Sequence, residues 1–392
     1  MKERVQTGLE RLVTDPPGWI GKARLGLLCN PASVDAGLHH ARRLIETSFP
    51  GKLKTLFSPQ HGFFAEKQDN MIESDDMTDP MLELPVFSLY GNTRIPTQAM
   101  FEAIDALLID LQDVGTRVYT FIYTASYCME VAGALNKTVV VLDRPNPVGG
   151  LQMEGNCLHP DYASFVGRYA VPMRHGLTVG ELCRLFNDHF GIGCDLEIIP
   201  MRGWRRHMYF EETGLPWVAP SPNMPTSETA VVYPGQVIWE GTNMSEGRGT
   251  TQPFELFGAP FLNTDRMIDI LEGPEFPGAL LRPCRFEPTA NKWAEVPCKG
   301  FQIHVTDPCK YKPYTTSLKL LSAVLHVHPD DFCWKQPPYE YEYHRLPIDL
   351  ILGDRRLRER IEALDDIDRL EETWAADLTD FKSVAEKCFL YE

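Results

Sequence analysis

Short apolar runs alternate with helix-like segments through the first half of the chain. Residues 25–29 form an apolar run that ends in Asn30-Pro31, and apolar residues then recur at helical spacing over residues 38–45. Three further apolar runs, each followed by polar residues, lie at positions 54–57, 106–109 and 139–142. Helical patterns follow the first, third and fourth runs. This order predicts an α/β domain with a doubly wound, mainly parallel sheet and helices on both faces.

The polar residues that end these runs predict a ligand site. In an open parallel sheet, ligands bind beyond the carboxyl ends of the strands. We therefore expect one rim of the sheet to carry Asn30, Gln60, His61, Asp110, Gln112, Asp113, Asp143 and Arg144.

A second, smaller domain is predicted in the last part of the chain. Thr178 and Glu181 have the spacing of a capping box and predict the start of a helix, and residues 195–199 predict another strand. Residues 215–234 are rich in proline and predict a rigid, extended crossing between domains. We expect a first domain over residues 1–234 and an α+β domain over residues 235–392. The second domain is expected to contain a strand near 301–305 and helices at 318–325 and 370–388.

Length and composition are those of a globular protein with two domains. The 392 residues exceed the usual size of one hydrophobic core, and 43% of them are hydrophobic against 23% charged. No apolar stretch is long enough to span a membrane. The first twenty residues lack the apolar centre of a signal peptide, which predicts a cytoplasmic location.

Charge, cysteine usage and motifs argue against several kinds of partner. The net charge of −16 and the lack of a basic stripe argue against nucleic acid. The ten cysteines include no C-x-x-C pair, and His326 and His328 lack an evident third ligand, so we expect no metal. We find no glycine motif for a dinucleotide or a P-loop, and no G-x-S-x-G or H-E-x-x-H motif, so we expect no cofactor.

A glycine-rich segment carries the densest set of reactive side chains. Glu240 precedes residues 241–251, which contain three glycines together with Asn243, Glu246 and Arg248. Glycines let the backbone bend sharply and approach a ligand closely. Further carboxylates at probable loop ends are Glu66, Asp69, Glu73, Asp110, Asp113, Asp143 and Glu154. Glycosidic cleavage commonly uses a protonated carboxyl together with a second carboxylate, so this inventory suits a glycosidase.

A series of ordered motifs runs from about residue 24 to the end of the chain. They are Leu28-Cys29-Asn30-Pro31, Pro59-Gln60-His61-Gly62, Ser88-Leu89-Tyr90-Gly91, Asp110-Leu111-Gln112-Asp113-Val114-Gly115-Thr116-Arg117, Leu142-Asp143-Arg144-Pro145-Asn146-Pro147, Arg174-His175-Gly176, Pro220-Ser221-Pro222-Asn223-Met224-Pro225 and Glu240-Gly241-Thr242-Asn243 with Ser245-Glu246-Gly247-Arg248-Gly249. Together they resemble the NamZ family of exo-β-N-acetylmuramidases. The resemblance implies a Rossmann-like N-terminal domain, a smaller C-terminal domain and an active site in the cleft between them. It also implies release of N-acetylmuramic acid from the non-reducing end of peptidoglycan fragments without attached peptide.

These observations give a list of candidate site residues. The catalytic candidates are Glu246, Glu240, Glu66, Glu154 and His61. The substrate-binding candidates are Asn30, Gln60, Asp110, Asp113, Arg117, Asp143, Arg144, Arg174, Asn223, Asn243 and Arg248. Muramic acid carries a lactyl carboxylate, which we expect one of the arginines of this set to bind in bidentate geometry.

One position departs from the family pattern. The resemblance implies Pro-Glu-His-Gly in most relatives where this chain has Pro59-Gln60-His61-Gly62, and it implies that this glutamate is the family's favoured catalytic carboxylate. An amide is not a general acid of comparable strength. Either another carboxyl supplies the proton, with Glu246 and Glu240 favoured because they lie in the glycine-rich segment, or this branch has a different substrate or no activity.

Three functions are therefore open on the sequence. The leading one is a glycosidase that acts on sugars containing muramic acid. The second is a non-catalytic muramyl-sugar-binding protein, for which Gln60 is the chief argument. The third is a nucleotide- or phosphosugar-binding enzyme, suggested by the doubly wound pattern alone. Retaining, inverting and substrate-assisted mechanisms are all compatible with the sequence, and the oligomeric state is left open.

Overall fold

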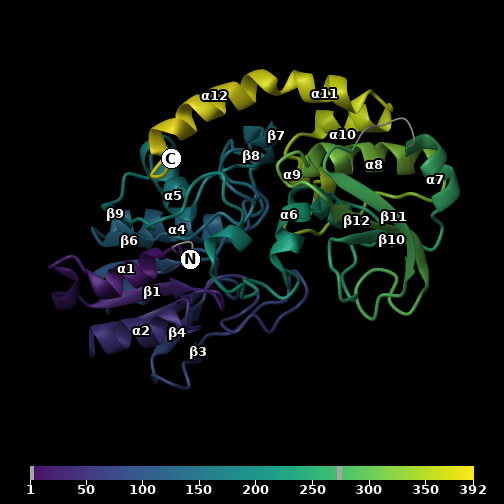
Figure 1. Cartoon of the computed structure of the whole chain (residues 1–392). Coiled ribbons are helices and arrows are strands. Elements are labelled where there is room, and N and C mark those ends of the chain that lie inside the picture. Colours follow the sequence, from purple (N-terminus) through teal and green to yellow (C-terminus); the bar gives the residue numbers. More distant parts are fainter. Residues whose placement is uncertain (1–3, 272–275) are drawn as a thin grey trace.

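A seven-stranded sheet forms the centre of the first domain in the computed structural model, which describes residues 4–271 and 276–392 (Figure 1). The strand order is β3-β4-β2-β1-β5-β6-β9. The parallel strands are β1 (Leu25–Cys29), β2 (Leu53–Ser58), β4 (Pro85–Ser88), β5 (Ala106–Asp110), β6 (Thr138–Leu142) and β9 (Leu196–Ile199), and the short edge strand β3 (Met77–Thr78) is antiparallel. The chain builds from β1 to one edge and from β5 to the other, which confirms the predicted doubly wound sheet.

Helices cover both faces of this sheet. One face is covered by α1 (Gly8–Thr14) and α2 (Ala41–Ser48), and the other by α3 (Gln98–Phe101), α4 (Phe121–Ala134) and α5 (Val179–Asp188). Leu108 and Val140 point into the first of these cores, whereas their neighbours Leu107 and Val141 point into the second. Successive strand residues face opposite sides, so burial on both sides explains the continuous apolar runs in the sequence. The predicted capping box of Thr178 and Glu181 is present at the start of α5.

The second domain is a smaller α+β unit. Its antiparallel sheet has the order β10-β12-β11, with β10 (Leu256–Ala259), β11 (Ala279–Phe286) and β12 (Cys298–Val305). Its helices include α6 (Ser227–Gln236), α7 (Thr264–Leu271), α8 (Pro313–Val327), α9 (Pro347–Leu352) and α10 (Arg355–Glu362). The central helix α8 is apolar and largely buried, with Leu318 and Leu321 fully covered. The strand and helix predicted over 301–305 and 318–325 lie within β12 and α8.

Two predicted elements differ from the structure. The extended crossing predicted over residues 215–234 ends earlier, because α6 begins at Ser227, where the Thr226 hydroxyl accepts from the Thr229 N–H at 3.2 Å. The single helix predicted over residues 370–388 is instead α11 (Ile367–Thr373), α12 (Ala375–Ala385) and a 3-10 turn, η5 (Glu386–Cys388). The backbone leaves helical geometry at Trp374, whose side chain is buried.

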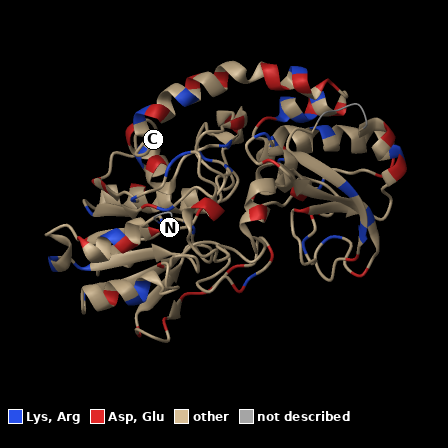
Figure 2. Ribbon diagram, in the orientation of Figure 1, with Lys and Arg blue, Asp and Glu red and all other residues tan. Residues whose placement is uncertain are grey.

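Helices α11 and α12 form an arch that leads the chain from the second domain back to the first (Figure 1). At the end of the arch, the Leu390 N–H donates to Glu181 at 2.9 Å and the Tyr391 hydroxyl donates to Asp143 at 2.5 Å. Acidic and basic residues both occur along the arch (Figure 2). None of the described helices is long and apolar enough to cross a membrane.

Buried hydrogen bonds also join the two domains directly. Arg117 donates to the carbonyl oxygens of Ile351 and Leu352, each at 2.9 Å. Asn156, in β7 (Glu154–Cys157), accepts from the Tyr314 hydroxyl at 2.8 Å. These bonds hold the second domain against the hairpin of β7 and β8 (Pro172–Arg174), and so help to set how the domains face each other.

Candidate active site

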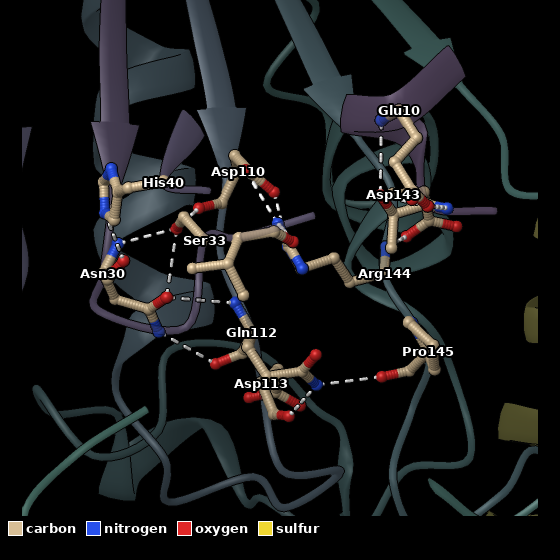
Figure 3. Close-up of polar contacts among 12 residues, drawn as sticks. Glu10, Asn30, Ser33, His40, Asp110, Gln112, Asp113, Asp143, Arg144 and Pro145 are labelled. Carbon is tan, nitrogen blue, oxygen red and sulfur yellow. Dashed lines mark hydrogen bonds and ion pairs between the residues drawn. The ribbon is translucent and has the colours of Figure 1, made fainter. Parts of the chain in front are cut away.

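The polar residues at the centre of the sheet's carboxyl edge bind one another (Figure 3). Arg144 donates to both oxygens of Asp110, at 2.5 and 2.9 Å. The Asn30 amide donates to the carbonyl oxygen of Gln112 at 3.1 Å, and the Ser33 hydroxyl donates to the carbonyl oxygen of Asp110. Since the strand order reverses between β1 and β5, these side chains fill the crevice in which a doubly wound sheet usually binds a nucleotide. The crevice therefore does not favour the nucleotide hypothesis.

Two further carboxylates at strand ends hold local structure. Asp143 accepts from the Gly180 N–H at 2.7 Å and from the Thr178 hydroxyl at 2.8 Å, and thereby anchors the first turn of α5. Asp113 accepts from the Gly115 N–H at 2.7 Å. A buried carboxylate needs such partners, so these contacts give both side chains a structural role. The strand-end residues lie at the carboxyl edge of the sheet, but the expectation that they all share the ligand site is corrected, because six of them do not line the cavity described below: Asn30, Asp110, Gln112, Asp113, Asp143 and Arg144.

Two of the predicted catalytic carboxylates also lie away from that cavity. Glu66 is exposed and accepts from the Phe64 N–H at 3.2 Å within its own loop. Glu154 is buried in β7 and accepts from the Thr315 N–H at the start of α8, at 2.8 Å. Burial raises the pKa of Glu154 to about 7. This hydrogen bond joins β7 of the first domain to α8 of the second domain.

Three predicted binding residues donate to backbone carbonyl groups outside the cavity. Arg117 binds the carbonyls of α9 described above, and Arg174 donates to the carbonyl oxygen of Val148. Asn243 donates to the carbonyl oxygen of Asp331 at 2.9 Å and thereby braces the glycine-rich segment. These three side chains therefore hold the backbone in place.

A cavity between the two domains collects the remaining candidates. Of the residues predicted from the sequence, Gln60, His61, Asn223, Glu240 and Arg248 line it. Its other polar and aromatic lining residues are Asn70, Tyr119, Thr120, Phe121, Ser221, Tyr233, Phe254, Tyr339 and Glu340. The volume is about 30 Å³, which is room for roughly two water molecules. This volume is smaller than a sugar ring.

Glu240, Glu246 and Arg248 of the glycine-rich segment form one buried cluster with Lys292 beside the cavity. Arg248 donates to Glu240 at 2.6 Å and lies 3.2 Å from Glu246, which also lies 2.8 Å from the ammonium group of Lys292. Burial by itself raises the pKa of Glu240, but the charge and hydrogen bond of Arg248 outweigh burial and hold that pKa below its usual value. Glu240 is therefore ionised at neutral pH.

The glycines of this segment are required by its close packing. Gly247 and Gly249 have φ angles of 78° and 77°, which favour glycine. A Cβ atom at Gly249 would lie 2.4 Å from the carbonyl oxygen of Ala290. The segment thus reaches its position only because these residues lack side chains.

His61 enters the cavity as a neutral imidazole. Its Nδ1 lies 2.7 Å from the carbonyl oxygen of Lys67, which only accepts hydrogen bonds, so Nδ1 carries the proton and Nε2 keeps a lone pair. Burial lowers the pKa of His61 to about 4. The ring can therefore accept a hydrogen bond from a ligand at neutral pH.

Glu340 is a cavity residue that the sequence analysis did not select. One carboxyl oxygen accepts from the Gln60 amide at 3.0 Å, and the other accepts from the Tyr90 hydroxyl at 2.5 Å. Burial raises the pKa of Glu340 to about 7. The neighbouring Tyr339 donates its hydroxyl to Glu240 at 2.8 Å. The alternation of aromatic and acidic residues over 339–343 was the available signal, but it follows two prolines rather than a predicted strand.

Gln60 has a fixed orientation between the two domains. Its amide oxygen accepts from the Thr120 hydroxyl at 2.8 Å, so its amide nitrogen is the atom that faces Glu340. The Gln60 amide thus donates a hydrogen bond to a carboxyl group that belongs to the second domain.

The chain matches known proteins over nearly its whole length. The family description "Exo-beta-N-acetylmuramidase NamZ, N-terminal" matches residues 25–228, and the corresponding C-terminal description matches residues 231–391. The chain is 40% identical over 390 residues to the peptidoglycan beta-N-acetylmuramidase NamZ of Bacillus subtilis strain 168, with 100% of this chain and 92% of that protein covered.

Two solved structures share the fold. Both are DUF1343 family proteins from Bacteroides fragilis NCTC 9343. One has a TM-score of 0.89 at 33% identity and covers 99% of both chains, and the other has a TM-score of 0.78 at 26% identity and covers 100% of this chain and 99% of that chain. Because both family descriptions and the full-length relative match, the chain belongs to the NamZ family.

Proposed function

We propose that the protein is an exo-acting glycosidase that releases N-acetylmuramic acid from the non-reducing end of peptide-free peptidoglycan fragments. Membership of the NamZ family and the name of the Bacillus subtilis relative support this activity. The observation that carries the proposal is the combination of an ionised carboxylate, Glu240, and a second carboxyl, Glu340, at one cavity between the domains. Glycosidic cleavage uses such a pair of carboxyl groups.

The residues at the cavity fit the demands of this reaction. Positive charge develops on the sugar ring in the transition state, and the ionised Glu240 stabilises it electrostatically. The free lone pair of His61 accepts a hydrogen bond from a sugar hydroxyl or amide. Arg248 is the candidate for the lactyl carboxylate, because among the described residues it is the arginine that lines the cavity.

A non-catalytic muramyl-sugar-binding protein is the second candidate. The observation that favours it is Gln60, an amide at the position where the family resemblance implies a glutamate. Such a protein binds N-acetylmuramic acid without turning over any glycoside of that sugar.

The test uses the purified full chain and two chromogenic substrates, the 4-nitrophenyl β-glycosides of N-acetylmuramic acid and of N-acetylglucosamine. We expect nitrophenolate release from the muramyl substrate at a rate at least about tenfold above that from the glucosaminyl one, the scale expected for one specific contact. Peptide-free glycan strands should release single N-acetylmuramic acid units, identified by mass spectrometry. Binding of N-acetylmuramic acid without release from any substrate would establish the second candidate instead. A cytoplasmic location stays a prediction, which cell fractionation tests.

A further inference from the structure

The cavity contains one carboxyl group whose hydrogen-bond partners are neutral. Glu240 is paired with Arg248, and Glu246 with Arg248 and Lys292. A carboxylate next to a cation favours its charged form and is a poor proton donor. Glu340 instead accepts from an amide, Gln60, and from a phenol, while the more distant charges of Glu240 and Arg94 act on its pKa in opposite directions. Glu340 can therefore be protonated, whereas the neighbouring cations keep Glu240 and Glu246 in their charged forms.

We propose that Glu340 is the general acid of this enzyme, the group that gives its proton to the glycosidic oxygen of the bound muramyl sugar. This assignment rests on the proposed function. It also accounts for the amide at position 60, because Gln60 orients the acid rather than acting as one.

The loop that carries Glu340 is held in an unusual conformation. Glu340 and Tyr341 have φ angles of 46° and 68°, in a region that residues other than glycine rarely adopt. Paired backbone hydrogen bonds between Tyr339 and Glu342, at 3.0 and 2.9 Å, close the turn, and the Tyr339 hydroxyl ties it to Glu240. Strain of this kind persists where surrounding contacts fix it, and it occurs often at functional sites. The turn therefore presents Glu340 beside the ionised Glu240.

The proposed step balances as an ordinary hydrolysis. The O–H bond of Glu340 breaks and its proton bonds to the glycosidic oxygen, while the bond from that oxygen to C1 breaks and its electron pair leaves with the departing alcohol. A water molecule then adds its oxygen to C1, and one of its protons returns to Glu340 directly or through solvent. No oxidant, reductant or further reactant is needed.

The test compares two leaving groups in a Glu340→Gln variant. In a disaccharide of N-acetylmuramic acid and N-acetylglucosamine, the leaving group is a sugar hydroxyl, which needs a proton to depart. The nitrophenolate of the chromogenic substrate is a stable anion and departs without one. We expect kcat/KM of the variant to fall about a hundredfold or more on the disaccharide and less than about tenfold on the 4-nitrophenyl glycoside of N-acetylmuramic acid. Glu342→Gln is the matched control, because it makes the same chemical change on the same loop at a carboxylate paired with Arg345 outside the cavity. We expect it to leave both values within about twofold of the wild type.

A second variant tests the role through proton affinity. Tyr90→Phe removes a hydrogen bond that stabilises the charged form of Glu340, so the pKa of Glu340 rises. The fall of kcat/KM on the alkaline side should then move to higher pH for the disaccharide. A merely structural role for Glu340 does not predict this movement.

The outcomes separate the assignment from the proposed function. Equal losses on both substrates in Glu340→Gln, with N-acetylmuramic acid still bound, overturn the assignment, as does an unchanged disaccharide rate or an alkaline limb that Tyr90→Phe leaves in place. A wild-type protein that cleaves neither substrate overturns the proposed function itself. Calorimetric binding of N-acetylmuramic acid and the thermal midpoint show that each variant has kept its fold.

Discussion

Restoring a carboxyl group at position 60 should place two acids within hydrogen-bonding distance. In Gln60→Glu, a carboxylate oxygen replaces the amide nitrogen that lies 3.0 Å from Glu340. Two unit charges at this separation repel each other by about 5.5 kcal/mol at an effective dielectric constant of about 20, which corresponds to about four pKa units. The pair therefore holds one proton through neutral pH, and its last deprotonation moves well above the pKa of about 7 that Glu340 has beside the amide.

The sign of the effect on activity follows from the need for a protonated acid. The wild-type enzyme should lose activity as the pH rises through about 7, because Glu340 ionises there. The variant keeps its shared proton to higher pH, so its alkaline limb should move upward by at least one unit. At pH 8.5 its kcat/KM, relative to its own maximum, should exceed that of the wild type by on the order of tenfold.

The assay is a profile of kcat/KM on the muramyl disaccharide from pH 5 to pH 10. Gln68→Glu is the matched control, since it introduces the same charge at an exposed position of the same connection between β2 and β3. An alkaline limb that stays in place or moves to lower pH in Gln60→Glu would refute the reasoning, because two carboxyl groups in contact cannot both ionise freely.

Three further predictions follow from the buried charges. Arg144→Ala leaves the Asp110 carboxylate buried and unpaired, so the free energy of unfolding in urea should fall by about 3–5 kcal/mol; a loss below about 1 kcal/mol contradicts this. Arg248→Ala should reduce the preference for the muramyl over the glucosaminyl nitrophenyl glycoside by about tenfold or more, and an unchanged ratio of kcat/KM values removes Arg248 from anion recognition. Glu154 has a folded-state pKa of about 7 against an ordinary value of 4.5, so the stability that its neutral form contributes is present below about pH 4.5 and is lost as the pH rises through 7. The wild type should thus lose up to about 3 kcal/mol relative to Glu154→Gln between pH 5 and pH 8, and a difference that does not change with pH speaks against the buried acid.

Local patterns in the sequence were enough to predict the sheet and many of its helices. The strands at residues 25–29 and 139–142 are continuous apolar runs because helices cover both faces of the sheet. Side chains on both sides of each strand are buried, so almost every residue of the strand is apolar. The capping box at Thr178 is likewise a matter of residues three positions apart. The motifs also identified the family, since each is a short stretch that is read without knowledge of its neighbours in space.

Only the tertiary structure decided which polar residues share a site. Asp110 ends one strand and Gln60 follows another strand of the same sheet. Asp110 is paired with Arg144, whereas Gln60 binds Glu340, a residue 280 positions away on a turn of the other domain. Whether a buried carboxyl is charged depends on the partner that folding places beside it, because a neighbouring cation stabilises the charged form and neutral donors in a buried setting do so much less. Sequence spacing carries no information about such partners when they come from different domains. The surroundings of Glu340 therefore follow from the tertiary structure, which brings residues of both domains together at the cavity.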